Sequence, residues 1–178
     1  HTDGGIAALN RLTIKAIADK GYGLDIFSLV ETNGEVDVRY LPEGIQVRYQ
    51  GFGGNKYYFS LAAWRAILQQ SYTYIFVDNV NLASILVPFV WLRRISYFVW
   101  LCGMEVFPPR PDWEGRLGLN GASKCLAISE YTRKNVATRY PDLRIDVCDL
   151  ALDPVRHSVA SGFPLPISPK PVALQAID

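Results

Sequence analysis

The sequence is poor in the residues that build metal sites, disulfide frameworks and histidine-dependent catalysis. Its 178 residues include three cysteines and two histidines. Cys102, Cys125 and Cys148 are widely spaced and form no C-x-x-C pair, which argues against zinc and disulfide frameworks and for a reducing cytosol. His1 and His157 are the only imidazoles, which argues against a histidine-based metal site and a Ser-His-Asp triad. We therefore expect no metal and no resident cofactor.

The chain also lacks an excess of charge and a long apolar run. A formal net charge of +1 argues against a nucleic-acid binder, which would carry a basic stripe. The most apolar stretch, Leu82 to Leu92, is too short to span a bilayer, so a buried helix is the better interpretation. No signal peptide is visible, and we expect a cytoplasmic protein.

Two common phosphate-binding fingerprints are absent as well. No G-x-G-x-x-G follows an expected strand, and the sequence contains no G-x-x-x-x-G-K-[ST]. Gly4-Gly5 before a helix is a more generic anion-binding arrangement. Glycine lets backbone N–H groups approach a phosphate, and the helix dipole adds partial positive charge. A plain turn is the alternative interpretation of these two glycines.

Short apolar segments alternate with segments of helical periodicity along the chain, and this alternation predicts the fold class. All-apolar strands between helices call for a mostly parallel sheet covered on both faces, a Rossmann-like three-layer α/β/α domain. Helices are expected at residues 6–18, 57–70, 81–95, 112–120 and 130–139. Strands are expected at 25–30, 36–40, 45–49, 74–77, 96–102, 124–128 and 144–147.

Ligands of such folds bind beyond the carboxyl ends of the strands, so the residues that follow each strand are the candidates for function. They are Asp78-Asn79, the turn from Cys102 to Glu105, and Ser129. Each has a structural alternative: Glu105 as a solvated side chain, Cys102 as a packed thiol and Ser129 as a helix N-cap. Arg133, one helical turn after Ser129, could help to hold an anionic group.

The expected domain boundaries suggest part of a longer protein. Residues 1–156 form the Rossmann-like domain, and its first strand is expected to precede Gly4-Gly5. The Pro- and Ser-rich residues 157–171 are typical of an interdomain linker. Residues 172–178 could then begin a second, C-terminal domain.

Taken in order, these segments resemble the N-terminal domain of retaining GT-B glycosyltransferases of glycosyltransferase family 4. The family opens with a strand, a Gly-Gly loop and a helix, as in Gly4 to Tyr22. It has a strand that ends near a His or Asn, as in Tyr74 to Asn79. A turn of the type HG-x-[DE]-V matches Cys102 to Val106, and A-x-S-E-[FY]-T-R matches Ala127 to Arg133. The resemblance spans roughly Gly4 to Pro154.

The resemblance implies a hexosyltransferase-type enzyme of carbohydrate biosynthesis. It would transfer sugar from a nucleotide-sugar substrate to a sugar or lipid-linked acceptor, with retention at the anomeric carbon and without a bound metal. Gly4, Gly5 and Asn79 would meet phosphate or sugar, and the turn from Cys102 to Glu105, with Ser129, would line the acceptor side. Within that turn, Cys102 and Glu105 are the candidate catalytic residues. The donor-binding elements of the family lie in the C-terminal domain, so the isolated chain is expected to be inactive.

One departure from the family pattern keeps alternatives open. Many members carry His at the position of Cys102, and a thiol cannot reproduce the hydrogen bonding of an imidazole. The chain could instead be a non-catalytic sugar- or phosphate-binding module, or an inactive paralogue. Another Rossmann-like enzyme, such as an epimerase or a flavodoxin-like protein, is a third reading. The segment from Phe89 to Arg94 suits a peripheral membrane contact at the inner face, or burial in the helical layer.

Overall fold

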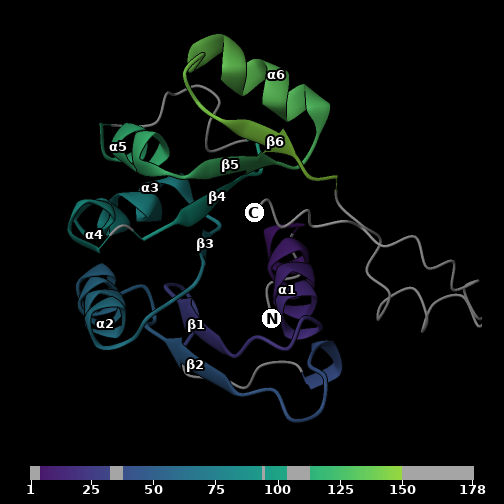
Figure 1. Cartoon of the computed structure of the whole chain (residues 1–178), viewed down its shortest axis with the longest axis vertical. Coiled ribbons are helices and arrows are strands. Elements are labelled where there is room, and N and C mark those ends of the chain that lie inside the picture. Colours follow the sequence, from purple (N-terminus) through teal and green to yellow (C-terminus); the bar gives the residue numbers. More distant parts are fainter. Residues whose placement is uncertain (1–4, 33–37, 94, 104–112, 150–178) are drawn as a thin grey trace, which may run out of the picture.

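The computed structural model describes residues 5–32, 38–93, 95–103 and 113–149, in which parallel strands alternate with helices (Figure 1). The α-helices are α1 (Gly5–Ala18), α2 (Lys56–Gln69), α3 (Val80–Ala83), α4 (Val87–Arg93), α5 (Trp113–Gly121) and α6 (Glu130–Arg139). The strands are β1 (Leu24–Ser28), β2 (Val47–Gly51), β3 (Ile75–Val77), β4 (Tyr97–Leu101), β5 (Lys124–Ala127) and β6 (Ile145–Val147). Two short 3₁₀ helices, η1 (Val38–Tyr40) and η2 (Ser84–Leu86), complete the described elements.

The described strands form two parallel groups. β1 pairs with β2, and β3, β4, β5 and β6 pair in that order. Figure 1 shows the strands following one another from β2 at the bottom to β6 at the top, with an interval between β1 and β3. Helices α2, α4 and α5 lie on one side of the strands and α1 lies on the other. The predicted α/β class with parallel strands is confirmed.

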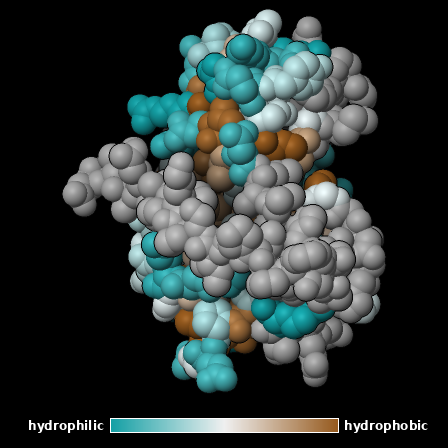
Figure 2. Space-filling view, turned by 90° about the vertical axis from the view of Figure 1, so that its right-hand side faces the viewer, coloured by the Kyte–Doolittle hydropathy of each residue, from teal (hydrophilic) through white to brown (hydrophobic). Residues whose placement is uncertain are grey.

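The main core lies around β4, which pairs with β3 on one side and with β5 on the other. Tyr97, Val99 and Leu101 of β4 are fully buried, and they pack with Leu119 of α5 and Val136 of α6. Figure 2 shows the side of the molecule on which α1 lies, where hydrophobic surface occupies a hollow at mid-height below a more hydrophilic upper part. The core is therefore centred on the β3–β6 group.

Two glycines set the distance between α5 and its neighbours. A methyl group on Gly118 would lie 2.8 Å from the Cβ of Ala83, and one on Gly121 would lie 2.6 Å from the Tyr97 hydroxyl. The Tyr97 hydroxyl donates a 2.5 Å hydrogen bond to the carbonyl of Gly118. The absence of side chains at Gly118 and Gly121 therefore lets α5 lie directly against α3 and β4.

The predicted strand at 36–40 is wrong in its described part, because residues 38–40 form η1. Tyr40 is buried there, and the guanidinium of Arg11 in α1 lies 5.9 Å from the centre of the Tyr40 ring. A tertiary contact with α1 thus overrides the local strand propensity. The strand expected at 45–49 forms two residues later, as β2.

The single helix predicted at 81–95 is also wrong, since three short pieces replace it: α3, η2 and α4. Pro88 has no N–H to donate to the carbonyl of Ser84, four residues earlier, so a regular α-helix cannot continue through this point. Phe89 of α4 is buried and its ring packs against Trp64, whereas Leu92 is exposed. Within the described ranges we find no helix of the length and hydrophobicity needed to cross a bilayer.

Candidate functional site

The residues that follow β3, β4 and β5 lie along one edge of the β3–β6 group. These strands are parallel and adjacent, so their carboxyl ends share that edge. Asp78 follows β3, Cys102 follows β4, and Ser129 lies two residues after β5. We call Asp78, Asn79, Cys102, Gly103 and Ser129 the carboxyl-edge site. The topology thus brings the ends of three strands from distant parts of the sequence to one edge.

Helix α1 is held against this edge by a side-chain contact. The amide nitrogen of Asn10 donates a 2.6 Å hydrogen bond to the Asp78 carboxylate. Gly5, the first residue of α1, lies about 7.5 Å from Asn10 along the helix axis. Because α1 ends at Ala18 on the way to the start of β1, Gly5 is at the end of the helix nearer the carboxyl ends of the strands. The amino-terminal end of α1 therefore extends beyond Asp78.

Asn79 has a capping role in the structure. Its side-chain oxygen accepts a 2.9 Å hydrogen bond from the backbone N–H of Asn81, at the start of α3. Asparagine is a favoured N-cap because its side chain satisfies an N–H that the first helical turn leaves unpaired. The cap fixes the Asn79 side chain beside Asp78, so both polar groups have defined positions at the end of β3.

β4 is followed by Cys102, which has a thiol side chain, and then by Gly103, which has no side chain. Cys102 is half-buried and forms no disulfide, and Gly103 is buried with a φ of 117°. That φ lies in a region that residues with a side chain rarely adopt, so the turn requires glycine. Any ligand that approached this turn would meet the Cys102 side chain and peptide groups of Gly103.

Ser129 is the N-cap of α6, as predicted. Its hydroxyl accepts a 3.1 Å hydrogen bond from the backbone N–H of Thr132 and lies 3.0 Å from the Thr132 hydroxyl. Arg133 forms a two-point ion pair with Glu130, at 2.8 and 2.5 Å. This pairing lowers the pKa of Glu130 and raises that of Arg133. An anion at α6 would therefore compete with Glu130 for Arg133.

Part of the predicted site lies outside the described residues. Gly4 and Glu105 are in this category, and so are the expected linker at 157–171 and residues 172–178. Within the described ranges, His, Cys, Asp and Glu side chains form no group of three that could hold a metal ion.

The glycine-rich loop after β2 uses its amides within the fold. The N–H groups of Phe52, Gly53 and Gly54 donate to the carbonyls of Ser28, Glu31 and Leu29, at 3.0, 3.0 and 2.6 Å. These bonds tie the loop to the end of β1. The three N–H groups are therefore satisfied by the protein itself and are poor candidates for binding a phosphate.

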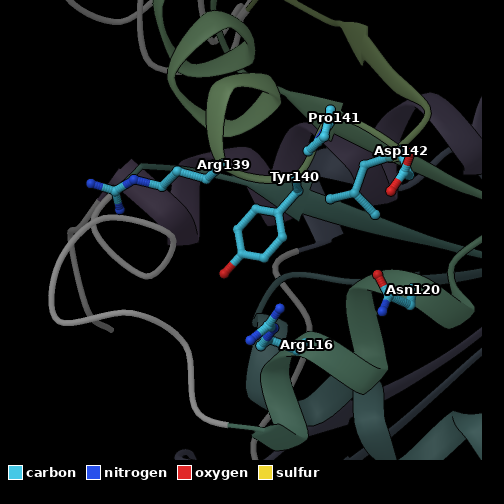
Figure 3. Close-up of a pocket in the computed structure, with 7 residues that line it drawn as sticks. Arg116, Asn120, Arg139, Tyr140, Pro141 and Asp142 are labelled. Atoms are coloured by element: carbon cyan, nitrogen blue, oxygen red, sulfur yellow. The ribbon is translucent and has the colours of Figure 1, made fainter.

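A cavity of about 260 Å³ lies between α5 and the segment that joins α6 to β6 (Figure 3). Arg116 and Asn120 line it from α5, and Tyr140 and Asp142 line it from that segment. The segment leads into β6, so this cavity is near the amino ends of the strands. It is therefore separate from the carboxyl-edge site, and the sequence pattern did not indicate it.

A second, larger cavity of about 820 Å³ lies between α2 and the β1–β2 pair. At one end of it Asp25 binds Arg48 at 2.7 and 2.6 Å and accepts a short hydrogen bond from the Tyr72 hydroxyl. Burial is the main cause that raises the Tyr72 pKa, and the bond to Asp25 adds to it. Arg48 also donates to Gln70 at 2.5 Å, so the polar groups here are mutually paired.

Sequence reasoning missed Asn10, the residue that connects α1 to the carboxyl-edge site. A weak signal was present, since asparagine is a poor residue for the interior of a helix and here follows an apolar run. The partner of such a residue, 68 positions away, cannot be read from a local pattern.

Comparisons with known proteins add no assignment to this geometry. The chain matches no protein-family model and no curated protein.

Proposed function

We propose that the chain is the acceptor-side domain of a two-domain, retaining glycosyltransferase of the GT-B type, which uses a nucleotide sugar as donor. The observation that carries the proposal is the convergence of Asp78, Cys102 and Ser129 at one edge of parallel strands. Ligands of open α/β sheets bind at this edge. The motifs that resemble family 4 glycosyltransferases contain these same residues or directly adjoin them.

The position of α1 also supports the proposal. The Asn10–Asp78 hydrogen bond places the amino-terminal end of a 14-residue helix beside the carboxyl-edge site. The unpaired N–H groups and the dipole of a helix start favour a negatively charged group. A nucleotide sugar carries such a group in its diphosphate, and Gly5 leaves the helix start without a side chain.

In this proposal the described domain positions the acceptor and a C-terminal domain holds most of the donor. Closure of two domains over the substrates supplies orientation and excludes water, which would otherwise hydrolyse the donor. The isolated chain is then expected to release no nucleotide from a nucleotide sugar. An acceptor of sugar or lipid-linked type and a cytoplasmic location at the inner membrane face belong to the same proposal.

A non-catalytic sugar- or phosphate-binding role is the second candidate, and Cys102 favours it. The thiol is half-buried at the end of β4, where the family resemblance expects an imidazole. A thiol is a weak donor and a weak acceptor, so it cannot replace both nitrogens of histidine.

The test uses the parent polypeptide that contains this chain and a panel of nucleotide sugars, with release of the nucleotide as the readout. We expect turnover of one donor by the parent protein and none by residues 1–178 alone. Cys102→His should leave the protein folded and maintain or increase donor hydrolysis. Cys148→His is a matched control, because Cys148 is also a half-buried thiol that follows a strand, β6.

Two results would contradict the proposal. A parent protein without a second Rossmann-like domain and without turnover of any donor would favour the non-catalytic candidate. Nucleotide release by the isolated chain would show that this domain does not need a partner domain for chemistry.

A further inference from the structure

The cavity of about 260 Å³ between α5 and the segment that joins α6 to β6 brings four polar side chains together. Arg116 and Asn120 lie one helical turn apart on α5, and Tyr140 and Asp142 belong to the joining segment. Figure 3 shows Arg116 and Tyr140 towards the left of the cavity, with Asn120 and Asp142 towards the right. Two elements that are separate in sequence therefore line one concave site.

The polar side chains of this cavity are not used by the fold. In the described part of the chain, the side chains of Arg116, Asn120 and Asp142 have no hydrogen-bond or ion-pair partner. At the same end of the strands, by contrast, Lys124 and Asp146 pair with each other at 2.7 Å. A guanidinium offers only donors and a carboxylate only acceptors. Both kinds of group are therefore available to a ligand in this cavity.

The charges that line the cavity are of both signs. Arg116 of α5 supplies a positive charge and Asp142 a negative one. Helices α5 and α6 end nearby, at Gly121 and Arg139, and the unpaired carbonyls of a helix end add partial negative charge. Figure 3 shows the Arg139 side chain directed away from the cavity. A ligand that carries an anionic and a cationic group matches these charges better than a simple anion does.

The size and the apolar wall of the cavity further restrict the ligand. Its volume of about 260 Å³ is slightly below the range of about 300–1,000 Å³ that is usual for sites of drug-sized ligands. Tyr140 and Leu143 line the cavity, and both are partly buried and packed against the main core. This packing gives the cavity a fixed apolar wall beside its charged groups. A small molecule with a short side chain would fill such a space.

We propose that this cavity binds a small zwitterion, of which a free α-amino acid is the simplest kind. The carboxylate of the ligand would pair with the guanidinium of Arg116 and accept a hydrogen bond from the Tyr140 hydroxyl. Its ammonium group would lie towards Asp142 and the side-chain oxygen of Asn120. Arginine suits a carboxylate because its planar fork can donate two parallel N–H···O bonds. The cavity is separate from the carboxyl-edge site, so this proposal does not depend on glycosyl transfer.

Isothermal titration calorimetry tests the proposal on the 178-residue chain, with a panel of free L-α-amino acids as probes. Two analogues of the amino acid that binds best separate its charges. One is the carboxylic acid that lacks the amino group, and the other is the amine that lacks the carboxylate. We expect saturable binding of at least one amino acid, and about tenfold or more weaker binding of each analogue, because each loses one charge-assisted contact.

Substitutions at the two charged residues locate the ligand. Arg116→Gln and Asp142→Asn should each weaken binding by about tenfold or more, and Arg116→Lys should have a smaller effect because it keeps the charge. Arg144→Gln and Asp149→Asn are the matched controls, since both side chains are exposed and neither lines the cavity. The controls should leave the affinity unchanged. Because Arg116 and Asp142 are also exposed, we expect all variants to fold, which thermal unfolding verifies.

Three results would overturn the proposal. If no amino acid binds saturably at millimolar concentrations, the side chains of the cavity are merely solvated. Equal affinity for inorganic phosphate, or for the acid without its amino group, would make the cavity a plain anion site. Binding that persists unchanged in both Arg116→Gln and Asp142→Asn would place the ligand elsewhere on the chain.

Discussion

Asn10 of α1 and Asp78 at the end of β3 are joined by a 2.6 Å hydrogen bond that spans 68 positions of the sequence. The bond connects the helix that leads into the β1–β2 pair with the first strand of the β3–β6 group. It also places the start of α1 beside the carboxyl-edge site. One amide thus contributes both to the stability of the fold and to the geometry of the candidate site.

Asn10→Ala removes this bond and leaves a partly buried carboxylate without its donor. We expect the free energy of unfolding to fall by about 1.5 to 3 kcal/mol, since hydrogen bonds to charged groups contribute about that much. Urea denaturation measures the change. The control is Asn135→Ala, because the Asn135 amide donates only to Tyr131 within α6. Equal effects of the two substitutions would show that the Asn10–Asp78 bond does not stabilise the fold.

Ser129→Ala removes the hydroxyl that caps α6, and we expect a loss of about 1 kcal/mol of stability. Ser129→Asp should retain most of it, because aspartate is also a good N-cap and its charge suits a helix start. The control is Ser60→Ala, since the Ser60 hydroxyl donates to Lys56 on the exposed surface of α2. Equal losses for alanine and aspartate at position 129 would contradict a capping role.

Gly118→Ala should destabilise the protein by roughly 1 to 3 kcal/mol, although alanine favours helices, because overpacking forces neighbouring groups apart. The added methyl group would lie 2.8 Å from the Cβ of Ala83 and from the backbone nitrogen of Ser84. Gly5→Ala is the matched control, since a methyl group there meets no atom within 4 Å. Thermal unfolding of both variants tests the prediction, and a stabilised Gly118→Ala would refute it.

The stability of the protein should fall above about pH 9, in part because Cys125 is buried. Burial raises the pKa of the Cys125 thiol to about 12 from its ordinary value of 9.0. Below pH 9 the thiol is neutral in the folded and unfolded chains alike. Between pH 9 and 12 only the unfolded chain releases the proton, so ionisation favours unfolding by up to about 1.4 kcal/mol per pH unit.

The comparison that isolates this effect is Cys125→Ala against the unchanged protein. The difference between their free energies of unfolding should be constant from pH 7 to about 8.5. At higher pH the unchanged protein should lose stability faster than the variant, because only the unchanged protein has the Cys125 thiol. Urea denaturation at several pH values supplies the data. Curves that remain parallel up to pH 11 would show that the thiol ionises in the folded chain as readily as in the unfolded one.

The sequence predicted the strands and helices best where local pattern and tertiary environment agree. The run from 130 to 139 has a capping serine and a single helical pattern, and α6 has those same bounds. The prediction failed where a single residue, or a contact between segments distant in sequence, determines the local structure. Pro88 divides the apolar run after β3, and the contact between Tyr40 and Arg11 replaces a strand with a 3₁₀ turn.

The site was predictable to the extent that topology determines it. Parallel strands bring Asp78, Cys102 and Ser129 to one edge, whichever contacts their side chains make. The side-chain partners could not be predicted, because they depend on packing between elements that are distant in sequence. The Asn10–Asp78 bond belongs to that class, as does the cavity beside Arg116.

The positive φ at Gly103 has a chemical consequence for whatever binds at the end of β4. A glycine offers only its amide and carbonyl there, and neither group gains or loses a proton between mild acid and mild alkali. The hydrogen-bonding groups of Gly103 should therefore stay the same over this pH range. Any acidity dependence of ligand capture would then originate in the ligand, or in groups of the protein other than Gly103.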